Sequence, residues 1–397
     1  MRVRQLVCLN AATVLAGMIA TACAPVESQA PASRVRTYYI AADEVAWDYA
    51  PSGMDQITGA PFSPIASLWT VRGPEQLGRV YKKALFREYD DGSFKTLKQR
   101  PPEWQYLGLL GPLLRAEVGD TIRVVFKNNT RRPVSLHPHG VFYKKNSEGA
   151  PYNDRTNEGD RADDGVPPGR EYTYEWPVPE RAGPTEHEGS SAFWMYHSHV
   201  SEEEDVNAGL IGPMIVTARG KANPDGAPID IDREIIIAFA EMDENMSWLF
   251  DDNIEAYGGN PASLKKKYGH GPAEHPHFPC NFFEPFCVSN FRESMNGFLF
   301  GNMPMVTMRQ GERVRWYLMG TTNFEVHAPH WHGNTVVINH MRSDVASLVT
   351  MGMVVADMVP DNPGTWLFHC HVLNHLMAGM QARYTVEAAQ PPRTTSQ

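Results

Sequence analysis

The sequence predicts an all-β protein made of two Greek-key β-sandwich domains in tandem. The first observation is local: β-branched and aromatic residues alternate with polar residues in short runs separated by Gly and Pro, and helical periodicity is scarce. The second is long-range, because the second half of the chain repeats the motifs of the first in the same order. A chain of 397 residues is also long enough for two domains.

Six runs show the alternation most clearly. They are TYYIAADEV (37–45), DTIRVVFKN (120–128) and EYTYEWPV (171–178) in the first half, and REIIIAFAEM (233–242), ERVRWYLMG (312–320) and MQARYTVEA (380–388) in the second. Each run has the length and the two-residue period of a strand with one face in a core. We expect all six to be strands.

The repeat sets the expected domain limits. LLGPLLRAEVGDTIRVVFKN precedes SLHPHG and YHSH in the first half, and LFGNMPMVTMRQGERVRWYLMG precedes HAPHWHG and FHCH in the second. A Gly- and Pro-containing stretch separates the two copies. We therefore expect a first domain over 34–217, a linker over 218–231, a second domain over 232–389 and a carboxyl-terminal tail over 390–397.

Residues 1–33 are typical of an export signal and a tail. Arg2 and Arg4 precede an apolar run that ends in small residues directly before Cys23. Small residues before a cysteine resemble a bacterial lipoprotein box, which would lipidate Cys23 and place the protein in the periplasm or on the outer membrane. Plain cleavage at the same point is the alternative, and Asn10 argues against a membrane-spanning segment.

With a net charge of −10 and interspersed charges, no nucleic-acid partner is expected.

Cysteine usage isolates one thiol. Cys280 and Cys287 flank NFFEPF in a Pro-rich segment, and an oxidising compartment favours a disulfide between them. Cys370 is then left unpaired in an exported protein, where a metal ion would protect it. Cys370 lies inside FHCHVLNHLMAGM, a stretch rich in soft ligands.

Ten of the fifteen histidines fall into four short clusters. Residues two apart on a strand point to the same face, so each His-x-His directs two imidazoles toward one place. One such pair alone is more often structural, but four in a repeated frame indicate a shared metal cluster. The clusters are His137 and His139; His197 and His199; His327, His330 and His332; and His369, His371 and His375.

Ligand softness indicates copper. A thiolate, two imidazoles and a thioether form the ligand set of a blue-copper electron-transfer site, and Cys370, His327, His375 and Met380 supply it. The other eight clustered histidines suit further copper ions better than magnesium or calcium. Because Cys370 stands between His369 and His371, one strand can connect the two kinds of site. These three residues are the predicted catalytic path for electrons.

These motifs resemble the four copper motifs of multicopper oxidases. The text around them resembles ceruloplasmin and the related domains of hephaestin and coagulation factors, whereas the number of domains resembles bacterial two-domain laccases. The resemblance implies cupredoxin-like domains and a copper-dependent oxidoreductase. Such an enzyme couples one-electron oxidation of a small donor to four-electron reduction of O2 to water.

The resemblance also implies a role for each ligand and a total of four coppers per chain. In the first domain Ser198 stands in place of Cys370, so only the second domain should hold a type 1 copper. The implied ligands are His327, Cys370, His375 and Met380 for type 1; His137 and His330 for type 2; and His139, His197, His199, His332, His369 and His371 for the type 3 pair.

The roles of two further sets of residues remain open. Glu148 resembles the acidic residue that relays protons near the type 2 copper in two-domain laccases, and a solvated acid is the alternative reading. His270, His275 and His277 could bind a labile metal or belong to a solvated loop.

The electron donor is not fixed by the sequence, and a phenol, a cuprous ion or a ferrous ion all deliver one electron. In ceruloplasmin the iron site beside the type 1 copper uses a Glu, a His and an Asp at the places held here by Val288, Glu293 and Asn374. Only Glu293 could bind a hard cation, so we expect a phenol or cuprous ion to be the better donor.

Two other functions are considered. A copper nitrite reductase needs no type 3 pair, so four His-x-His motifs disfavour it. A copper-binding protein without turnover, as among the coagulation-factor relatives, would have eroded motifs, and these are intact.

Each domain supplies four cluster histidines, so the cluster should form where a first domain meets a second domain. A homotrimer, closed as a ring, provides that contact between chains. A cluster inside one chain is the alternative.

Overall fold

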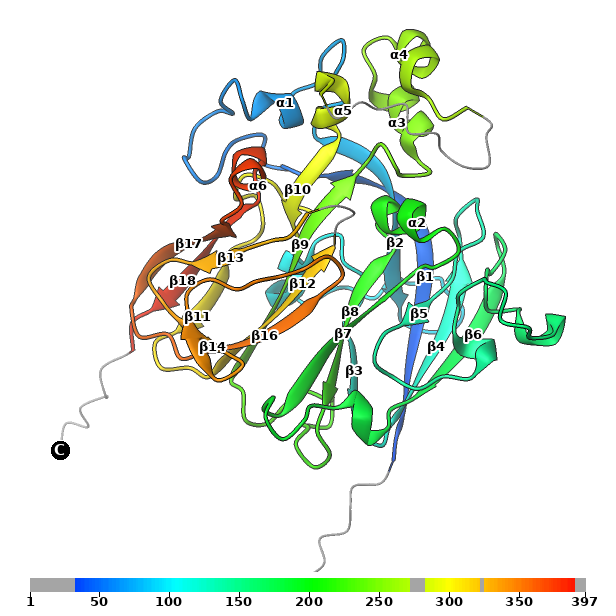
Figure 1. The fold of residues 1–397 in the computed structure, drawn as a ribbon, viewed down its shortest axis with the longest axis vertical. Coiled ribbons are helices and arrows are strands. Elements are labelled where there is room, and N and C mark those ends of the chain that lie inside the picture. The colour runs from blue at the N-terminus through cyan, green and yellow to red at the C-terminus, as the bar shows by residue number, and fades with distance from the viewer. Residues whose placement is uncertain (1–32, 272–282, 322–324, 390–397) are drawn as a thin grey trace, which may run out of the picture. The chain divides into compact units, whose positions relative to one another are not determined.

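The computed structural model describes residues 33–271, 283–321 and 325–389. Within these ranges the protein is built mostly from β-strands (Figure 1). All six runs predicted as strands lie on strands. The all-β fold class is confirmed.

The first sandwich contains two four-stranded sheets, with strand orders β2-β1-β4-β6 and β3-β8-β7-β5. Ile122, Val124 and Phe126 alternate with more exposed residues along β4 and are fully buried. They share one hydrophobic core with residues of the facing sheet, such as Met214 and Val216. The strands are β1 (Val35–Asp48), β2 (Val80–Tyr89), β3 (Leu114–Glu117), β4 (Thr121–Asn128), β5 (His137–Pro138), β6 (Glu171–Pro177), β7 (Ser191–His197) and β8 (Ile211–Thr217).

The second sandwich contains a six-stranded sheet, β10-β9-β12-β16-β14-β15, and a four-stranded sheet, β11-β18-β17-β13. Its strands β9 and β12 are almost wholly buried, which explains their nearly continuous apolar sequence. The strands are β9 (Arg233–Asp243), β10 (Phe291–Met295), β11 (Val306–Arg309), β12 (Val314–Thr321), β13 (Pro329–Trp331), β14 (Val336–Ile338), β15 (Met341–Ser343), β16 (Met353–Met358), β17 (Gly364–Cys370) and β18 (Gln381–Glu387).

The two sandwiches have the same topology. In each, the first strand is parallel to a central strand, as β1 is to β4 and β9 is to β12. The facing sheets likewise match, with β3 parallel to β8 and β11 parallel to β18. This agreement confirms the internal repeat, and the hairpin β14–β15 is an addition to the second copy.

Helices are short and lie between strands. None in the described part of the chain is long and apolar enough to cross a membrane. Helices α3 and α4 contact each other (Figure 1). The helices are α1 (Ser67–Thr70), α2 (Glu202–Ala208), α3 (Phe250–Tyr257), α4 (Pro261–Tyr268), α5 (Pro285–Ser289) and α6 (Leu373–Ala378).

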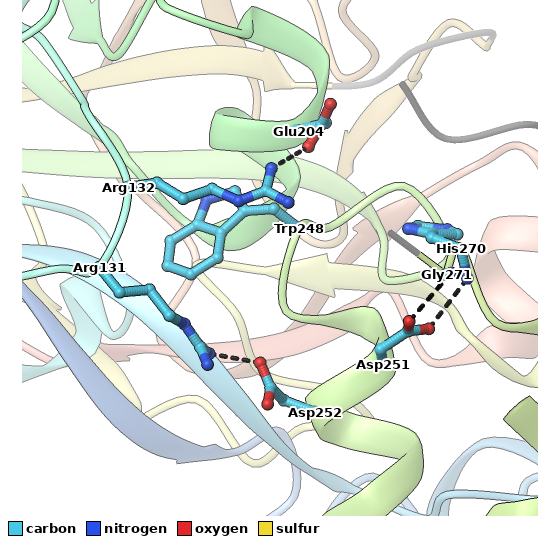
Figure 2. Close-up of a pocket in the computed structure, with 8 residues that line it drawn as sticks. All are labelled: Arg131, Arg132, Glu204, Trp248, Asp251, Asp252, His270 and Gly271. Carbon is cyan, nitrogen blue, oxygen red and sulfur yellow. Dashed lines mark hydrogen bonds and ion pairs between the residues drawn. The ribbon is translucent and has the colours of Figure 1, made fainter. Parts of the chain in front are cut away.

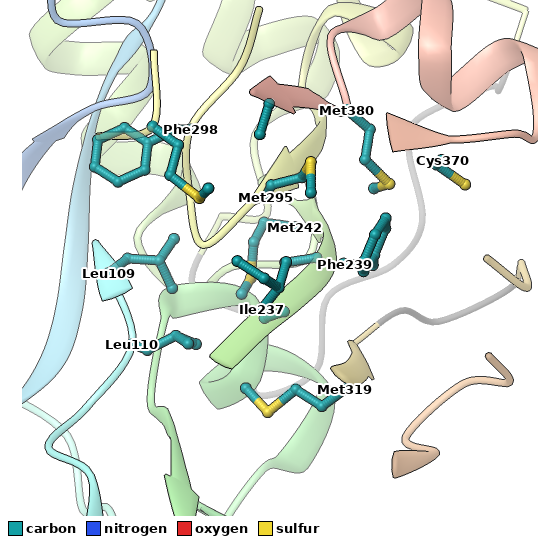
Figure 3. Packing of buried hydrophobic residues seen from close by; sticks show 14 of the residues in the cluster. Leu109, Leu110, Ile237, Phe239, Met242, Met295, Phe298, Met319, Cys370 and Met380 are labelled. Carbon is teal, nitrogen blue, oxygen red and sulfur yellow. The ribbon is translucent and has the colours of Figure 1, made fainter. Parts of the chain in front are cut away.

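A second hydrophobic core joins the two sandwiches. Figure 3 shows Leu109 and Leu110 of the first sandwich facing Ile237 and Met295 of the second. The backbone N–H of Leu109 donates to the carbonyl of Asn296 at 3.1 Å, so the contact has polar as well as apolar partners. The first sandwich therefore both packs against the second sandwich and forms a hydrogen bond with it at Asn296.

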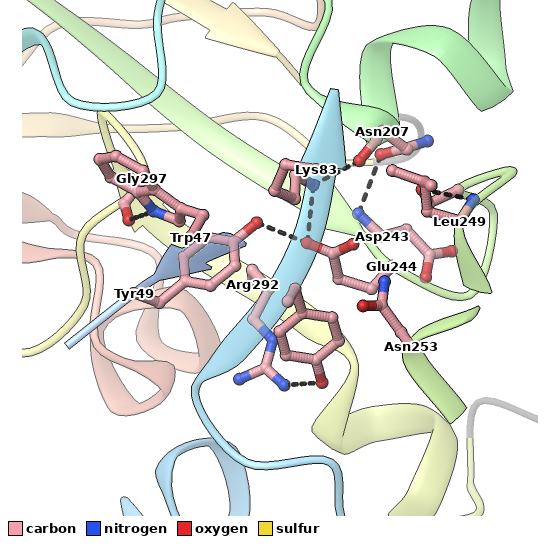
Figure 4. Close-up of polar contacts among 12 residues, drawn as sticks. Trp47, Tyr49, Lys83, Asn207, Asp243, Glu244, Leu249, Asn253, Arg292 and Gly297 are labelled. Carbon is pink, nitrogen blue, oxygen red and sulfur yellow. Dashed lines mark hydrogen bonds and ion pairs between the residues drawn. The ribbon is translucent and has the colours of Figure 1, made fainter. Parts of the chain in front are cut away.

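A buried ion pair crosses the same boundary. Lys83 on β2 and Glu244 after β9 are both fully buried, with Nζ and Oε1 2.7 Å apart. Lys83 also donates to the carbonyl of Asn207, and the hydroxyl of Tyr49 donates to Glu244 (Figure 4). Burial lowers the pKa of Lys83 and Glu244 opposes that shift. Charges at this depth stay favourable only while they are paired.

The predicted export signal and the predicted disulfide involve residues outside the described ranges. The export signal and Cys23 lie outside the described residues, as does Cys280. Cys287 is disulfide-bonded, and Cys370 is a free, buried cysteine. The contrast between Cys287 and Cys370 agrees with the cysteine assignment made from the sequence.

Candidate copper centres

Three buried donor atoms converge at the end of β17. The Sγ of Cys370 lies 3.5 Å from Nδ1 of His375 and 3.9 Å from Nδ1 of His327. The two Nδ1 atoms are 3.2 Å apart. For a trigonal ion held by two imidazoles and a thiolate, donor separations of about 3.5 to 3.7 Å are expected. The donor set and its spacing fit a type 1 copper ion.

Local structure brings Met380 to the same place. Helix α6 carries His375 and ends at Gly379, whose φ of +109° suits glycine. A Cβ on Gly379 would also lie 2.9 Å from the ring of Phe300. The chain then reverses, and the N–H of Cys370 donates to the carbonyl of Met380 at 3.1 Å. Met380 is fully buried in the core that Figure 3 shows.

The surroundings of these ligands disfavour charged imidazoles. Burial lowers the pKa of His327 to about 3, and the neighbouring His375 adds to this shift. Burial also raises the pKa of the Cys370 thiol, while the N–H groups of Ala328 and Val372 oppose it. The Nε2 of His327 is buried and has no hydrogen-bond partner. Neutral imidazoles are the form that binds a metal ion.

Four histidines of the second sandwich form a set at the ends of β13 and β17. The strands pair so that His330 lies opposite His369. Nε2 of His369 lies 3.1 Å from Nε2 of His332 and 3.2 Å from Nδ1 of His330. The ring of His371 is 5.1 Å from that of His330. Nδ1 of His369 donates to the carbonyl of Cys370, which leaves Nε2 free to bind a metal.

The first sandwich holds an equivalent set at the ends of β5 and β7. His137 lies opposite His197 in this pairing. Nε2 of His139 is 3.1 Å from Nε2 of His197, and the ring of His199 is 5.1 Å from that of His137. Burial lowers the pKa of His139 to about 4 and that of His197 to about 3. Burial therefore disfavours the charged form of His139 and His197, as it does at His327.

The structure does not bring the two sets together within one chain. Each contains four of the predicted cluster histidines, which interact with one another. Among the described residues, no hydrogen bond or ring contact joins a histidine of the first set to one of the second. Each set is therefore half of the predicted cluster. We call them the first and the second half-cluster.

In the first sandwich a hydrogen-bonded pair stands where the second has the type 1 ligands. The N–H of Ser135 donates to the hydroxyl of Ser198 at 3.0 Å, as the N–H of Ala328 does to Cys370. Ser198 in turn donates to buried Asp205 at 2.6 Å. Burial raises the pKa of Asp205 to about 6. Serine and aspartate offer no soft donors, in agreement with a first domain that lacks type 1 copper.

Glu148 contacts the first half-cluster through its backbone. Nδ1 of His137 donates to the carbonyl of Glu148 at 2.7 Å, which orients the ring. The carboxylate of Glu148 accepts from Lys145 and, at 3.0 Å, from Tyr152. Glu148 therefore positions His137, and its carboxylate is part of an ion pair.

Beside His375 the structure places Glu293, which the sequence indicated, together with Glu241 and Glu325, which it did not. Glu241 and Glu293 are directly opposite each other on β9 and β10, and both are buried. One oxygen of each lies within 4.8 Å of a ring nitrogen of His375. Glu325 accepts from Nε2 of His375 at 2.8 Å. Burial raises the pKa of Glu293 well above its usual range, and the charges of Glu241 and Glu325 add to this effect.

Each half-cluster also has a carboxylate that the motifs did not indicate. Glu202 Oε2 lies 3.3 Å from Nε2 of His199. Asp344 Oδ2 lies 3.9 Å from Nε2 of His330. The sequence signal was weak, because Glu202 lies in a run of acids and Asp344 lies outside every motif.

His270, the described member of the predicted labile site, lines a separate cavity of about 200 Å³. Figure 2 shows it beside Asp251, whose carboxylate accepts its backbone N–H at 3.0 Å. Arg131 and Arg132 lie on the other side, around Trp248. His275 and His277 lie outside the described residues.

Comparison with protein families agrees with this donor set. Residues 106–221 and 281–390 each match a family model described as multicopper oxidase. The matched segments hold every predicted copper ligand and cover more than half of the chain. The chain belongs to the multicopper oxidase family.

Curated relatives within this family are much longer. The chain is 44% identical over 355 residues to Ferroxidase HEPHL1 of Mus musculus, 41% over 365 residues to hephaestin of Rattus norvegicus, and 37% over 356 residues to ceruloplasmin of Homo sapiens. These alignments cover 88%, 90% and 89% of this chain but only 29%, 30% and 32% of the relatives. The chain thus spans about a third of their length.

Solved structures give the same fold. A crystal structure of a multicopper oxidase is matched with a TM-score of 0.53 and 19% identity, covering 89% of this chain and 90% of that one. The blue copper oxidase from Nitrosomonas europaea gives 0.51 and 19%, covering 90% and 86%. The cupredoxin-like sandwich architecture expected from the sequence is confirmed.

Proposed function

We propose that this protein is a two-domain multicopper oxidase that takes single electrons from a small donor and reduces O2 to water. The observation that carries the proposal is the strand end at which Cys370 lies between His369 and His371. The thiol converges with His327 and His375, while the flanking imidazoles belong to the second half-cluster. Copper bound at these residues would supply one-electron transfer and dioxygen reduction.

We assign the ligands as the sequence implied them, for four coppers per chain. The type 1 ligands are His327, Cys370, His375 and Met380. The type 2 ligands are His137 and His330. The type 3 ligands are His139, His197, His199, His332, His369 and His371.

The proposed assembly is a homotrimer in which each cluster combines two chains. Among the described residues of one chain, no hydrogen bond or ring contact joins a histidine of one half-cluster to a histidine of the other. A first half-cluster from one chain and a second from its neighbour would complete one cluster. Such a head-to-tail contact closes as a ring. Copper would favour the ring because only the assembled state offers complete sites.

Carboxylates beside the half-clusters fit the need for protons, which the conversion of O2 to water consumes. The carboxylates of Glu202 and Asp344 lie next to His199 and His330. Glu148 contacts His137 through its backbone carbonyl, and its carboxylate is paired with Lys145. We propose that they orient these ligands and hold protons close to them.

The donor we favour is a redox-active divalent cation, with ferrous ion as our candidate. Like charges directly opposite each other on paired strands destabilise a sheet, and Glu241 and Glu293 are such a pair. A bound cation would offset that cost. Nδ1 of His375 faces Cys370 while its Nε2 faces Glu293 and Glu325, so one imidazole connects the two places.

This preference for a hard cation departs from the ranking drawn from the sequence. Val288 and Asn374 do replace two ligands of the ceruloplasmin pattern. Glu241 and Glu325 supply carboxylates to the same place from other positions. Oxygen ligands of this kind suit hard cations better than cuprous ion.

Export, with Cys23 as a possible lipid anchor of a periplasmic or outer-membrane protein, completes the proposal. It is supported by the signal-like amino-terminal sequence.

The test uses copper-loaded protein with O2 uptake as the readout. Wild-type protein should be blue and consume O2 with a reducing donor. Cys370→Ser should lose the blue absorption and nearly all turnover while keeping its far-UV circular dichroism. Cys287→Ser is the matched control and should stay blue. A blue, active Cys370→Ser protein would exclude the proposed path.

A further inference from the structure

A pair of exposed histidines outside the copper centres connects the two sandwiches. His187 lies on the segment before β7, and His340 lies in the turn between β14 and β15. Their ring centroids are 6.0 Å apart at an angle of 80°. Histidine pairs inside the half-clusters of this protein have separations of 4.6 to 5.6 Å. The surface pair is 0.4 Å wider than the widest of these pairs, 6.0 against 5.6 Å.

A carboxylate adds a third donor beside this pair. Oε1 of Glu186 lies 3.2 Å from Nε2 of His187. Two ligands of one tetrahedral zinc ion are separated by about 3.3 Å when each metal–ligand bond is about 2.0 to 2.1 Å. Glu186 and His187 are both well exposed, at 85% and 72% of the side chain. All three side chains are exposed, so rotation about their side-chain bonds is open to bring their donor atoms onto one ion.

The scaffold under both histidines is rigid. Arg315 on β12 donates to the hydroxyls of Ser190 and Ser191 at 2.9 Å, which fixes the His187 segment to the second sandwich. Arg315 also forms a bidentate pair with Asp357 on β16. Val337 of the hairpin is the strand partner of Asp357. One residue, Asp357, thus connects the supports of both histidines.

The turn holds His340 in a conformation that histidine rarely adopts. Ile338 pairs with Met341, so Asn339 and His340 form a two-residue hairpin turn. Their φ values are +48° and +64°, and the second position of such a turn favours glycine. A histidine there costs conformational energy, which a ligand contact could offset.

We propose that His187, His340 and Glu186 form a surface site for a divalent transition-metal ion, with Zn²⁺ as the probe. The donors are two imidazoles and one carboxylate, and water completes the coordination. The ion connects the first sandwich to the hairpin of the second. This site is independent of the copper centres and of the proposed oxidase activity.

The experiment is a calorimetric Zn²⁺ titration of full-length, copper-loaded protein. His275 and His277 are replaced by Ala in all samples to remove a competing histidine-rich segment. The parent should bind one Zn²⁺ per chain at this site. His187→Ala and His340→Gly should weaken that binding by at least about tenfold.

The controls separate ligand loss from a damaged turn. Glycine suits the φ of residue 340, so His340→Gly should fold as stably as the parent without Zn²⁺. Asn339→Gly changes the same turn but removes no ligand, and it should bind Zn²⁺ normally. Zn²⁺ should also raise the Tm of the parent and of Asn339→Gly, but not that of His340→Gly. Parent-like Zn²⁺ binding by both His187→Ala and His340→Gly would overturn the proposal.

Discussion

Two inactive variants should restore each other if the cluster is shared between chains. His137→Ala destroys the first half-cluster and leaves the second intact, and His369→Ala does the reverse. In a ring, a cluster is complete where the first sandwich of a His369→Ala chain meets the second sandwich of a His137→Ala chain. Random assembly of equal amounts gives this arrangement at about one quarter of the contacts.

The recovered rate of O2 uptake depends on the ratio of the two variants. Because a complete cluster needs one chain of each kind, activity should follow the product of the two fractions and reach its maximum at equal amounts. That maximum should be about one quarter of the wild-type rate per chain. The two chains, with different affinity tags, are expressed together so that copper is bound during assembly. The whole mixture should follow the product rule, whereas mixed rings isolated through both tags hold one complete cluster at three contacts and should reach about one third of the wild-type rate per chain at any ratio. O2 uptake is then measured.

A second pair of variants serves as the control, because both of its substitutions lie in the same half-cluster. His137→Ala with His197→Ala damages the same half-cluster in every chain, so it should recover no activity. Both pairs retain the type 1 ligands and should stay blue. Isolated mixed rings of the first pair without O2 uptake would refute the shared cluster, as would a fully active monomer.

Three further predictions follow from single contacts. Glu293→Gln should raise the KM for ferrous ion by about tenfold or more and leave kcat/KM for a phenol within about twofold; an equal loss with both donors would contradict a cation site. Lys83→Met should lower the free energy of unfolding by about 3 to 5 kcal/mol in urea, and adding Glu244→Gln should reduce that loss. Ser198→Cys should still give one blue copper per chain by spin quantitation, because Asp205 is not an imidazole; a second blue signal would argue against this assignment.

Much of the fold could be predicted because a local signal and a long-range signal agree. Strand alternation and the internal repeat both follow from how each sandwich buries one face of its sheets, as Ile122, Val124 and Phe126 do on β4. The hairpin β14–β15 was not predicted, since strands of three residues have no measurable period. The packing of Leu109 on the second sandwich depends on long-range contacts that no local pattern reports.

The candidate copper ligands could be predicted because residues two apart on a strand point to the same face, so their spacing in the sequence gives their direction. The residues missed are those that depend on register or loop length. Glu241 was missed because it becomes the neighbour of Glu293 only through the pairing of β9 and β10. Asp205 was missed because of loop length. The segment from Ser198 to the end of α2 is longer than the segment from Cys370 to the end of α6. Counting residues after Ser198 therefore does not lead to Asp205, which contacts Ser198 in the structure.

In the proposed assembly one chain supplies all the type 1 ligands, whereas each three-copper cluster takes its ligands from two chains. All type 1 candidates, and the carboxylates beside His375, lie in the second sandwich of one chain. The two half-clusters that would receive electrons share no hydrogen bond or ring contact among the described residues of that chain, so in the proposed assembly a complete cluster needs two chains. A separated chain should therefore bind type 1 copper, turn blue and accept one electron, yet fail to consume O2. Blue absorption would then report folding of the second sandwich, and O2 uptake would report assembly, so a single interface variant should separate the two.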